Sequence, residues 1–305
     1  MRKEFCNTIE GIATKNKKIL FLTGDLGFMA LEGIQKSIGN RFLNVGVSEQ
    51  NMISMAASLS SKGFTVICYS IAPFTVFRPA EQIRLDVCLH NMDVKIIGNG
   101  GGYGYGIMGS THHAIEDIAV LSSFQNMRCY IPFCVEDVAE VTRQMMNRRG
   151  PGYIRLERGL KPDFIKIPDY SPIRQILHGD KLTIVSMGPV SLNALAAIEA
   201  ISPAKDIADV FIVSEIPMVE LTEQLVSSIK KTGKILVIEE HVSRGGLGEN
   251  LSLQLMLASV VPEKFSHLHA VGYPDGLYGD QAFHQEKSNI DKESIQQTIK
   301  KMINE

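Results

Sequence analysis

Short apolar runs rich in β-branched residues alternate with helix-length amphipathic segments along the whole chain. In the first half these runs are KKILFLTGD, RFLNVGV, FTVICYS, DVKIIGN and MRCYIPF. A second series follows, made of KLTIVSMG, DVFIVSE, KILVIEEH and a last strand near HLHAVGY. This alternation is typical of parallel sheets, because parallel strands must be joined by a crossover that is usually a helix. The sequence therefore predicts an α/β fold with two parallel sheets.

Chain length and one proline-rich passage indicate two domains. A chain of 305 residues is long for a single core. The passage LKPDFIKIPDYSPIRQILHGD has no helical period and separates the two series of strands. We therefore predict a first domain at residues 1–165, a linker at 166–180 and a second domain at 181–305. The tail DKESIQQTIKKMI predicts one closing helix.

Composition and charge narrow the functional classes. The 31 basic and 33 acidic residues are scattered and give a net charge of −2, which disfavours binding to nucleic acid or to an anionic membrane. No apolar run approaches the roughly 18 residues that a membrane span needs, and the charged start is unlike a signal peptide. Five cysteines without a CxxC pair indicate reduced thiols, most of them buried. These features predict a cytoplasmic protein.

Ligands of open parallel sheets bind beyond the carboxyl ends of the strands, so the loops at those ends are the candidate site. In the first domain these loops are GDLGFM (24–29), GVSEQN (46–51), SIAPFTVFRP (70–79), GNGGGYGYGIMGSTHH (98–113) and LERG (156–159).

A lone acid, Glu49, stands where an apolar run ends and a helical pattern begins. With Ser48 as N-cap, Glu49 would lie in the first helical turn, where an acid gains roughly 0.3 to 1 kcal/mol from the helix dipole. A capping box would need Glu or Gln three residues after the cap, where Asn51 stands instead. Taken alone, Glu49 is either a helix-stabilising acid or a functional one.

The glycine-rich loop contains GYGIMG (104–109), which matches the GxGxxG pattern of dinucleotide sites. That pattern needs its tight turn directly after a strand and an acid about twenty residues further on. Here several glycines and a tyrosine come first, and the residues around Asn126 are neutral. The loop therefore disfavours nicotinamide chemistry.

Other strand-end residues also allow a structural role beside a functional one. His112 and His113 stand at the entrance of an expected helix with Thr111 as its cap, and adjacent histidines make a poor metal pair. Histidine in such a loop is nevertheless suited to proton transfer or to binding hydroxyl groups. Phe74 and Phe77 have a spacing that is common in protein cores.

Arg155 and Arg158 flank two residues in IRLERG, and for them a surface salt bridge is a simpler expectation than anion binding.

No single motif decides the function, but the order of the motifs is specific. The segments GDLG, NVGVSEQNM, YSIAPFTVFRPAEQIR, GGYGYGIMGSTHHAIEDIA and GYIRLERG follow one another on expected strand-end loops of one sheet. In this order the chain resembles the second half of transketolase, its pyrimidine-binding domain followed by the family's C-terminal α/β domain. The resemblance covers nearly the whole chain and is most specific in residues 24–159. The chain is similar to the smaller subunit of a split transketolase.

The resemblance implies a binding site for thiamine diphosphate. The glutamate matched by Glu49 hydrogen-bonds a ring nitrogen of the aminopyrimidine and holds its imino form, so that the exocyclic nitrogen can remove the thiazolium proton. Phe74 and Phe77 match the aromatic pocket around the pyrimidine, and Ile71 stands where an aromatic residue is common. Asp25 of GDLG matches an aspartate near the cofactor.

Substrate contacts of the family are matched only in part. His112 matches a histidine that contacts donor hydroxyls, and Arg158 matches an arginine that binds the substrate phosphate. Met108 stands where the family usually has an aspartate that reads a substrate hydroxyl. Met29 replaces a serine used for phosphate, and Gly100 replaces a further histidine. The resemblance therefore implies retained chemistry on a changed substrate, with weaker phosphate dependence than in ordinary transketolase.

The family's diphosphate and Mg²⁺ site uses a GDG motif followed further on by Asn, on another domain, and no GDG occurs in this chain. The resemblance thus implies that this chain supplies no metal ligand. It implies a partner, the diphosphate-binding N-terminal transketolase subunit, with two copies of each chain in an α2β2 heterotetramer.

The function implied in this way is the transfer of a two-carbon ketol unit from a ketose to an aldose, with a sugar or sugar phosphate as substrate. A related alternative uses pyruvate as donor, as deoxyxylulose phosphate synthases and 2-oxoacid dehydrogenase β subunits do. SEQNM and THHAIEDIA favour the first version, and Met108 keeps the second one open. A non-catalytic regulatory subunit is disfavoured by the intact cofactor residues and by His112.

Overall fold

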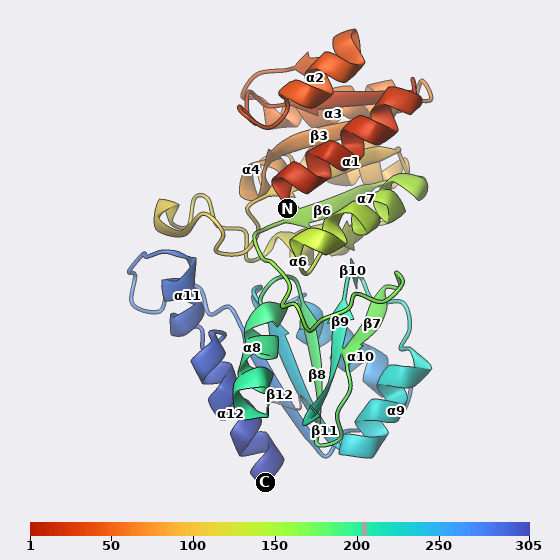
Figure 1. Cartoon of the computed structure of the whole chain (residues 1–305). Coiled ribbons are helices and arrows are strands. Elements are labelled where there is room, and N and C mark those ends of the chain that lie inside the picture. The colour runs from red at the N-terminus through yellow and green to blue at the C-terminus, as the bar shows by residue number, and fades with distance from the viewer. Residues whose placement is uncertain (203–205) are drawn as a thin grey trace.

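The computed structural model describes residues 1–202 and 206–305 and shows two α/β domains stacked on each other (Figure 1). The first domain is built on a seven-stranded sheet with the order β10-β5-β6-β4-β3-β1-β2. All neighbouring strands are parallel except β10 and β5. The strands are β1 Ile19–Thr23, β2 Phe42–Asn44, β3 Thr65–Ile71, β4 Val94–Asn99, β5 Arg128–Tyr130, β6 Gly152–Leu156 and β10 Glu215–Ile216.

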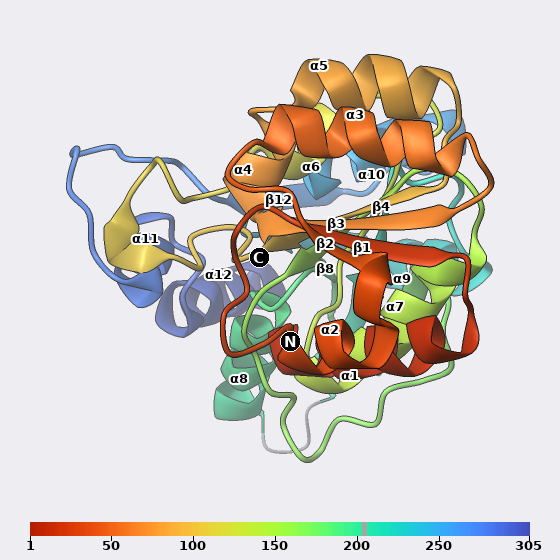
Figure 2. The ribbon, with the colours of Figure 1, turned by 90° about the horizontal axis from the view of Figure 1, so that it is seen from above.

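Helices cover both faces of this sheet, as Figure 2 shows from above. One face carries α3 Glu49–Ser60, α5 Ala80–Gln82 and the π-helical turn η2 Ile83–Leu89. The other face carries α1 Arg2–Lys15, α2 Glu32–Ile38 and α7 Val138–Asn147. The remaining helical elements are η1 Gly39–Arg41, α4 Ala72–Val76, η3 Gly106–Met108, α6 Asp117–Ser122 and η4 Val135–Asp137.

Burial on both faces explains why the inner strands of this sheet are mostly apolar. Every residue of β1 and β6 is buried, and β3 and β4 are exposed only at their ends. A strand covered by helices on both sides has no position that faces water. The edge strand β2 is partly exposed and correspondingly ends in a polar residue, Asn44.

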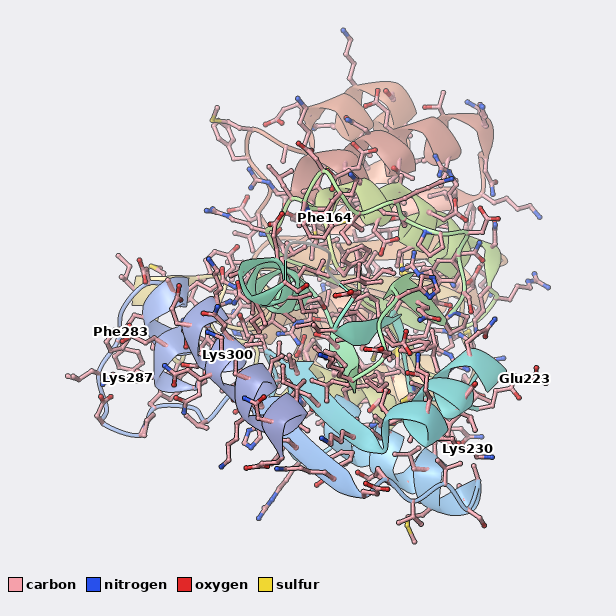
Figure 3. All side chains as sticks on the ribbon, turned by 60° about the horizontal axis from the view of Figure 1, so that its bottom comes forward. Phe164, Glu223, Lys230, Phe283, Lys287 and Lys300 are labelled. Carbon is pink, nitrogen blue, oxygen red and sulfur yellow. The ribbon has the colours of Figure 1, made fainter. Side chains whose placement is uncertain are left out.

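The second domain has a five-stranded sheet with the order β12-β11-β8-β9-β7. Its strands are β7 Ile173–Leu177, β8 Leu182–Met187, β9 Ala208–Val213, β11 Lys234–Glu239 and β12 Lys264–His269, and only β7, which pairs with β9, runs antiparallel. Its helices are α8 Ser191–Ile201, α9 Glu223–Thr232, α10 Leu247–Leu257, α11 Gln281–Lys287 and α12 Lys292–Asn304. Figure 3 shows α9, with Glu223 and Lys230, and α12, with Lys300, on opposite sides of this domain.

The predicted α/β fold with two mostly parallel sheets is confirmed, and α12 confirms the predicted closing helix. Two strands were not predicted, the two-residue β10, which pairs with β5, and β7. β7 lies inside the segment expected to be a linker, where it pairs with β9. A short edge strand has little apolar period of its own, because its pairing depends on a distant partner strand. The limits of the two domains stay a prediction.

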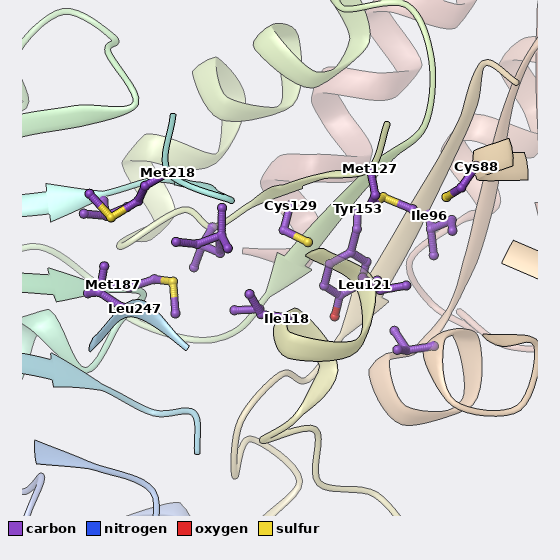
Figure 4. Close-up of a cluster of buried hydrophobic side chains, with 14 of the residues drawn as sticks. Cys88, Ile96, Ile118, Leu121, Met127, Cys129, Tyr153, Met187, Met218 and Leu247 are labelled. Atoms are coloured by element: carbon purple, nitrogen blue, oxygen red, sulfur yellow. The ribbon is translucent and has the colours of Figure 1, made fainter. Parts of the chain in front are cut away.

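One continuous core joins the two domains. β10 follows β9 of the second domain but extends the first sheet, with Ile216 opposite Cys129 of β5. Figure 4 shows side chains from both domains in this core, among them Ile118, Cys129, Met187 and Leu247. The first sheet is therefore held in a fixed position relative to the second domain.

Arg155 forms a buried ion network at this junction. Its Nε lies 2.9 Å from Oε1 of Glu157, and its Nη1 lies 3.6 Å from Oδ1 of Asp117. Its Nη2 donates to the backbone carbonyl of Glu240 at 2.7 Å. The expectation of a surface salt bridge at Arg155 is therefore wrong, because β6 is an inner strand and the second domain covers this part of it.

All five cysteines are buried and carry free thiols, as predicted. Within the described ranges of the chain, no helix has both the length and the apolar character that crossing a membrane requires.

Candidate active site

The loops predicted to form the site meet at the carboxyl edge of the first sheet. The loop after β2 contacts the loop after β3 through an ion pair of 3.1 Å between Glu49 Oε1 and Arg78 Nη1. The loop after β3 reaches the glycine-rich loop after β4, where the ring centroids of Phe74 and His112 lie 5.1 Å apart. Residues from three loops thus form one cluster.

Glu49 is the first residue of α3 and is only 3% exposed. Ser48 is the N-cap, as predicted, but its hydroxyl donates to the carbonyl of Val45 and does not cap the helix. Both carboxylate oxygens of Glu49 accept from Arg78 Nη1, at 3.1 and 3.2 Å. A buried carboxylate requires such a partner, so its position depends on a group outside its own helix.

Arg78 completes a slot between Glu49 and Phe74. Its guanidinium carbon lies 3.9 Å from the centroid of the Phe74 ring, while the same guanidinium donates to Glu49. The Arg78 side chain is 48% exposed. Glu49 and Phe74 thus hold a planar, nitrogen-rich group between a carboxylate and an aromatic face. Sequence analysis missed Arg78, which lies in the turn after α4 rather than on the helix with Phe74.

The other predicted cofactor residues lie at the strand ends of the same sheet. Ile71 is the last residue of β3, and Phe77 is the partly exposed C-cap of α4. Asp25 has a left-handed backbone with φ 57°, and its side chain accepts from Asn44 Nδ2 at 2.9 Å. Asp25 also lines a neighbouring pocket of about 190 Å³.

The His112 ring lies close to two aromatic rings, those of Phe74 and Tyr105, with ring centroids 5.1 and 5.8 Å away. Its Nδ1 is 2.9 Å from the hydroxyl of Thr111. The prediction that Thr111 caps a helix is wrong, because α6 begins only at Asp117. The backbone before α6 is extended, since Ala114 forms an antiparallel bridge with Gly102.

His113, in contrast, is buried and serves to anchor the loop. Its Nε2 is 2.7 Å from the carbonyl oxygen of Gly106, and its Nδ1 is 2.8 Å from the hydroxyl of Tyr273. A carbonyl can only accept, so Nε2 carries the proton and Nδ1 accepts from Tyr273. Burial lowers the pKa of His113 from 6.5 to about 4. Neutral His113 therefore ties the glycine-rich loop to the second domain.

This anchor predicts a loss of stability in mild acid. Between pH 6.5 and about 4 the unfolded chain binds a proton at His113 that the folded chain does not, so unfolding becomes easier by up to roughly 3 kcal/mol as the pH falls. Urea unfolding at pH 7 and pH 5 should show a smaller pH effect in His113→Gln than in the wild type. His178→Gln, at an exposed position, is the control and should behave like the wild type. Equal pH effects in all three proteins would contradict the anchor.

The glycine-rich loop also places Tyr105. Gly100 has φ +74°, and a Cβ at this position would clash with the Tyr105 ring. The Tyr105 hydroxyl accepts from Asn99 Nδ2 at 3.0 Å. The glycine at position 100 is therefore needed both for its backbone conformation and for the space that Tyr105 fills.

A pocket of about 310 Å³ opens between this loop, the loop after β6 and the start of α1. Arg158, an exposed residue, lines it, and its match to a phosphate-binding arginine stays a prediction. Arg2 and Lys3 line the same pocket and were missed, because the fold brings α1 here from the far end of the sequence. Three cationic side chains thus line one cavity together with one acid, Glu157, and their excess positive charge favours an anionic ligand.

The comparison with known families agrees with this geometry. Residues 1–162, more than half of the chain, match the family described as "Transketolase, pyrimidine binding domain". The chain belongs to the transketolase family. Residues 173–286 of this transketolase-family chain match the description "Transketolase, C-terminal domain".

Several curated relatives support the family assignment. The chain is 29% identical to one of the subunits of apulose-4-phosphate transketolase of Phocaeicola vulgatus, covering 99% of this chain and 97% of that protein. The corresponding subunit from Actinobacillus succinogenes is 32% identical over 85% of this chain and 84% of its own length. A 1-deoxy-D-xylulose-5-phosphate synthase of Clostridium perfringens is 28% identical, and the match covers 79% of this chain but 39% of the synthase.

Solved transketolase structures share the fold. A chain described as "Split gene transketolase, inactive beta4 tetramer" superposes with a TM-score of 0.81 at 26% identity, covering 99% of this chain and 97% of that one. The transketolase from Leishmania mexicana superposes with a TM-score of 0.76 at 15% identity, covering 99% of this chain and 45% of its own, and shows the common fold alone.

A transketolase pyrimidine-binding domain implies thiamine diphosphate as cofactor. The residues present fit its pyrimidine end, because the slot between Glu49 and Phe74 already holds the planar guanidinium of Arg78. In the described part of the chain, no group of three or more His, Cys, Asp or Glu side chains is placed to hold a metal ion. The described residues therefore fit the pyrimidine end of thiamine diphosphate.

Proposed function

We propose that this chain is the pyrimidine-binding subunit of a split transketolase that transfers a two-carbon ketol unit from a ketose to an aldose. The arrangement of Glu49, Arg78 and Phe74 at the edge of the pyrimidine-binding domain carries this proposal. Similarity over most or nearly all of their length to proteins described as single subunits of a transketolase supports the split arrangement. An assay of ketol transfer by the purified chain, with and without a diphosphate-binding partner, tests it.

Each side chain of the site has a proposed role. Bound thiamine diphosphate supplies a nucleophilic thiazolium carbon. Glu49 shares a proton with the pyrimidine ring nitrogen, and Phe74 stacks on the ring once Arg78 has moved aside. His112, which lies close to two aromatic rings, binds substrate hydroxyls and moves a proton at one of them. These roles need a buried carboxylate and a half-buried imidazole, and both are present.

A partner subunit completes the proposed site. Large apolar side chains are exposed on the loops around the slot, where a partner would cover them. They are Phe28, Met29, Val47, Phe77, Ile107 and Met108. The partner would supply the diphosphate and Mg²⁺ site, and two copies of each chain would form an α2β2 heterotetramer. In support, the split-gene relative is described as inactive when it is a β4 tetramer.

The cationic side chains that line the pocket with Arg158 indicate whether the substrate is phosphorylated. Met29 and Gly100 remove two phosphate contacts that are usual in the family, which favours weak phosphate dependence. Arg2 and Lys3 add positive charge beside Arg158 and offset that loss. We therefore propose a phosphorylated sugar as substrate, as in the relatives named apulose-4-phosphate transketolase.

Replacing Arg158 by Ala should raise the KM for a phosphorylated substrate much more than the KM for its unphosphorylated analogue. A lost charge-assisted contact costs about 1.5 to 3 kcal/mol, which corresponds to roughly 10- to 150-fold. Steady-state kinetics of the assembled complex with both substrates measures this difference. Arg149→Ala, at an exposed position before the amino end of β6, is the matched control. Equal effects of Arg158→Ala on both substrates would show that Arg158 does not bind phosphate.

Two observations support the alternative reaction, in which pyruvate is the donor. The chain is similar to 1-deoxy-D-xylulose-5-phosphate synthases, and Met108 lacks the carboxylate that would read a ketose hydroxyl. Assays of the assembled complex with pyruvate and with ketose phosphates as donors distinguish the two reactions.

A further inference from the structure

Asn99 and Tyr105 form a polar pair in the wall of the pocket that Arg158 lines, and the proposed chemistry does not use them. Asn99 Nδ2 donates to the Tyr105 hydroxyl at 3.0 Å. Among the described residues, none accepts from that hydroxyl and none donates to Asn99 Oδ1. Both residues are partly exposed, and Asn99 Oδ1 is not enclosed by protein atoms. One donor and one acceptor thus remain available in this wall.

The position of Asn99 in the sheet places the pair between the cofactor slot and the cations. Asn99 ends β4 and pairs with Ile71 of β3 and with Leu156 of β6. The segment after β3 carries Phe74, and the segment after β6 carries Arg158. Neighbouring strands lie about 4.8 Å apart, so a ligand that reached from one segment to the other would span roughly 10 Å and cross the end of β4.

Tyr105 lies on the same path. Its ring packs over the backbone of Gly100, another residue of the pocket wall, where a Cβ would clash with the ring. Its ring centroid is 5.8 Å from that of His112, whose ring lies in turn 5.1 Å from that of Phe74. Tyr105 therefore connects the wall of the cation pocket with the residues at the slot.

The two free groups suit a hydroxyl of a ligand. A hydroxyl both donates and accepts, so a single one can accept from Tyr105 and donate to Asn99 Oδ1. A fully ionised phosphate only accepts, and an alkyl chain does neither.

The charge and size of the pocket narrow the ligand further. Arg2, Lys3 and Arg158 favour an anionic group in the same pocket. The volume of about 310 Å³ lies within the roughly 300 to 1,000 Å³ of small-molecule sites. The ligand that fits all these features is a hydroxylated chain with a phosphate at one end.

We propose that Asn99 and Tyr105 bind a hydroxyl in the middle of the substrate chain, between the carbon that reacts at the slot and the phosphate held by Arg158. The pair then determines specificity, because it selects polyhydroxylated phosphates over deoxygenated ones. This assignment rests on the proposed function, since it describes the substrate of the same site.

A purely structural role of the pair makes a different prediction. If the hydrogen bond between Asn99 and Tyr105 only held the glycine-rich loop in place, removing the Tyr105 hydroxyl would loosen the loop and weaken all ligands of the pocket alike. The ratio of the affinities for two phosphates that differ only in their hydroxyl groups would then stay unchanged. The proposal predicts a change in that ratio.

Binding of two small phosphates to the chain alone tests the proposal. The ligands are erythritol 4-phosphate and butyl phosphate, which has the same chain length and no hydroxyls, and neither carries a carbonyl group that could react. Calorimetric titration at pH 7 should show that the wild type binds erythritol 4-phosphate about tenfold or more tightly than butyl phosphate. Tyr105→Phe and Asn99→Leu should each reduce this preference to about twofold or less, while binding butyl phosphate within about threefold of the wild type.

Two further variants serve as controls. Tyr170→Phe also removes one tyrosine hydroxyl, which donates to Glu215 Oε1 at 2.7 Å outside this pocket, and it should keep the preference of the wild type. Arg158→Ala should weaken the binding of both phosphates, because it removes a cation and leaves the pair intact.

Several results would overturn the assignment. These are equal affinities of the wild type for both phosphates, a preference that survives in Tyr105→Phe or in Asn99→Leu, an equal loss in Tyr170→Phe, or no binding of either phosphate. If a variant does not fold, a crystal structure of the wild type with erythritol 4-phosphate decides. It must place a hydroxyl oxygen within hydrogen-bond distance of Tyr105 Oη and Asn99 Oδ1, and a ligand whose hydroxyls all point away from both atoms contradicts the proposal.

These titrations need neither a partner protein nor ketol transfer. Their failure would leave the proposed transketolase reaction standing, and an inactive complex would leave the binding preference intact.

Discussion

Replacing Glu49 by Gln should leave the chain folded and reduce ketol transfer by the assembled complex by about 10²- to 10⁴-fold at saturating thiamine diphosphate and Mg²⁺. The amide has nearly the shape of the carboxylate and still accepts from Arg78 Nη1, so the contact of 3.1 Å in the free chain is kept. It cannot share a proton with a pyrimidine ring nitrogen as a carboxylate does. Glu49→Gln should therefore keep the fold and lose most of the ketol-transfer activity.

The matched control for this variant is Glu140→Gln. Glu140 is a partly exposed carboxylate on α7, on the opposite face of the sheet, where it pairs with Arg143. Thermal unfolding should show both variants close to the wild type, and single-turnover kinetics of the complexes should show a loss only for Glu49→Gln. Near-normal rates in Glu49→Gln would contradict the assignment of Glu49 to the cofactor.

Sequence reasoning predicts the parts of the fold that depend on local pattern. Strands buried on both faces are mostly apolar, so β1, β3 and β4 stand out as runs, although β4 contains the buried Lys95. The order of strand-end motifs then places Glu49, Phe74 and His112 at one edge, where the structure brings them together. Their roles in catalysis stay predictions.

Features that depend on distant contacts could not be predicted in this way. The ion network of Arg155 exists because the second domain covers β6, and nothing in IRLERG distinguishes it from a surface arginine. Arg2 reaches the pocket of Arg158 only because α1 packs at that edge of the sheet. The start of α6 is delayed to Asp117 by the bridge at Ala114, which a local capping pattern cannot reveal.

The second large expected effect is the gain in affinity for thiamine diphosphate when the partner subunit is present. A pyrimidine ring held by Glu49 and Phe74 alone gains one charge-assisted hydrogen bond and one ring stack, together about 2 to 4 kcal/mol. That corresponds to millimolar affinity or weaker. The diphosphate and its metal ion would find their ligands on the proposed partner. We therefore expect the chain alone to bind thiamine diphosphate barely, and the complex to bind it at least about a thousandfold more tightly.

Titration calorimetry tests the split site most directly. Thiamine diphosphate with Mg²⁺ is titrated into the purified chain, and then into the chain mixed with its diphosphate-binding partner. Light scattering of the same samples gives the mass of the assembly. The account predicts no measurable binding by the chain alone, micromolar or tighter binding by the mixture, and a mass of two copies of each subunit with ketol transfer. Tight binding by the chain alone, or ketol transfer without a partner, would contradict it.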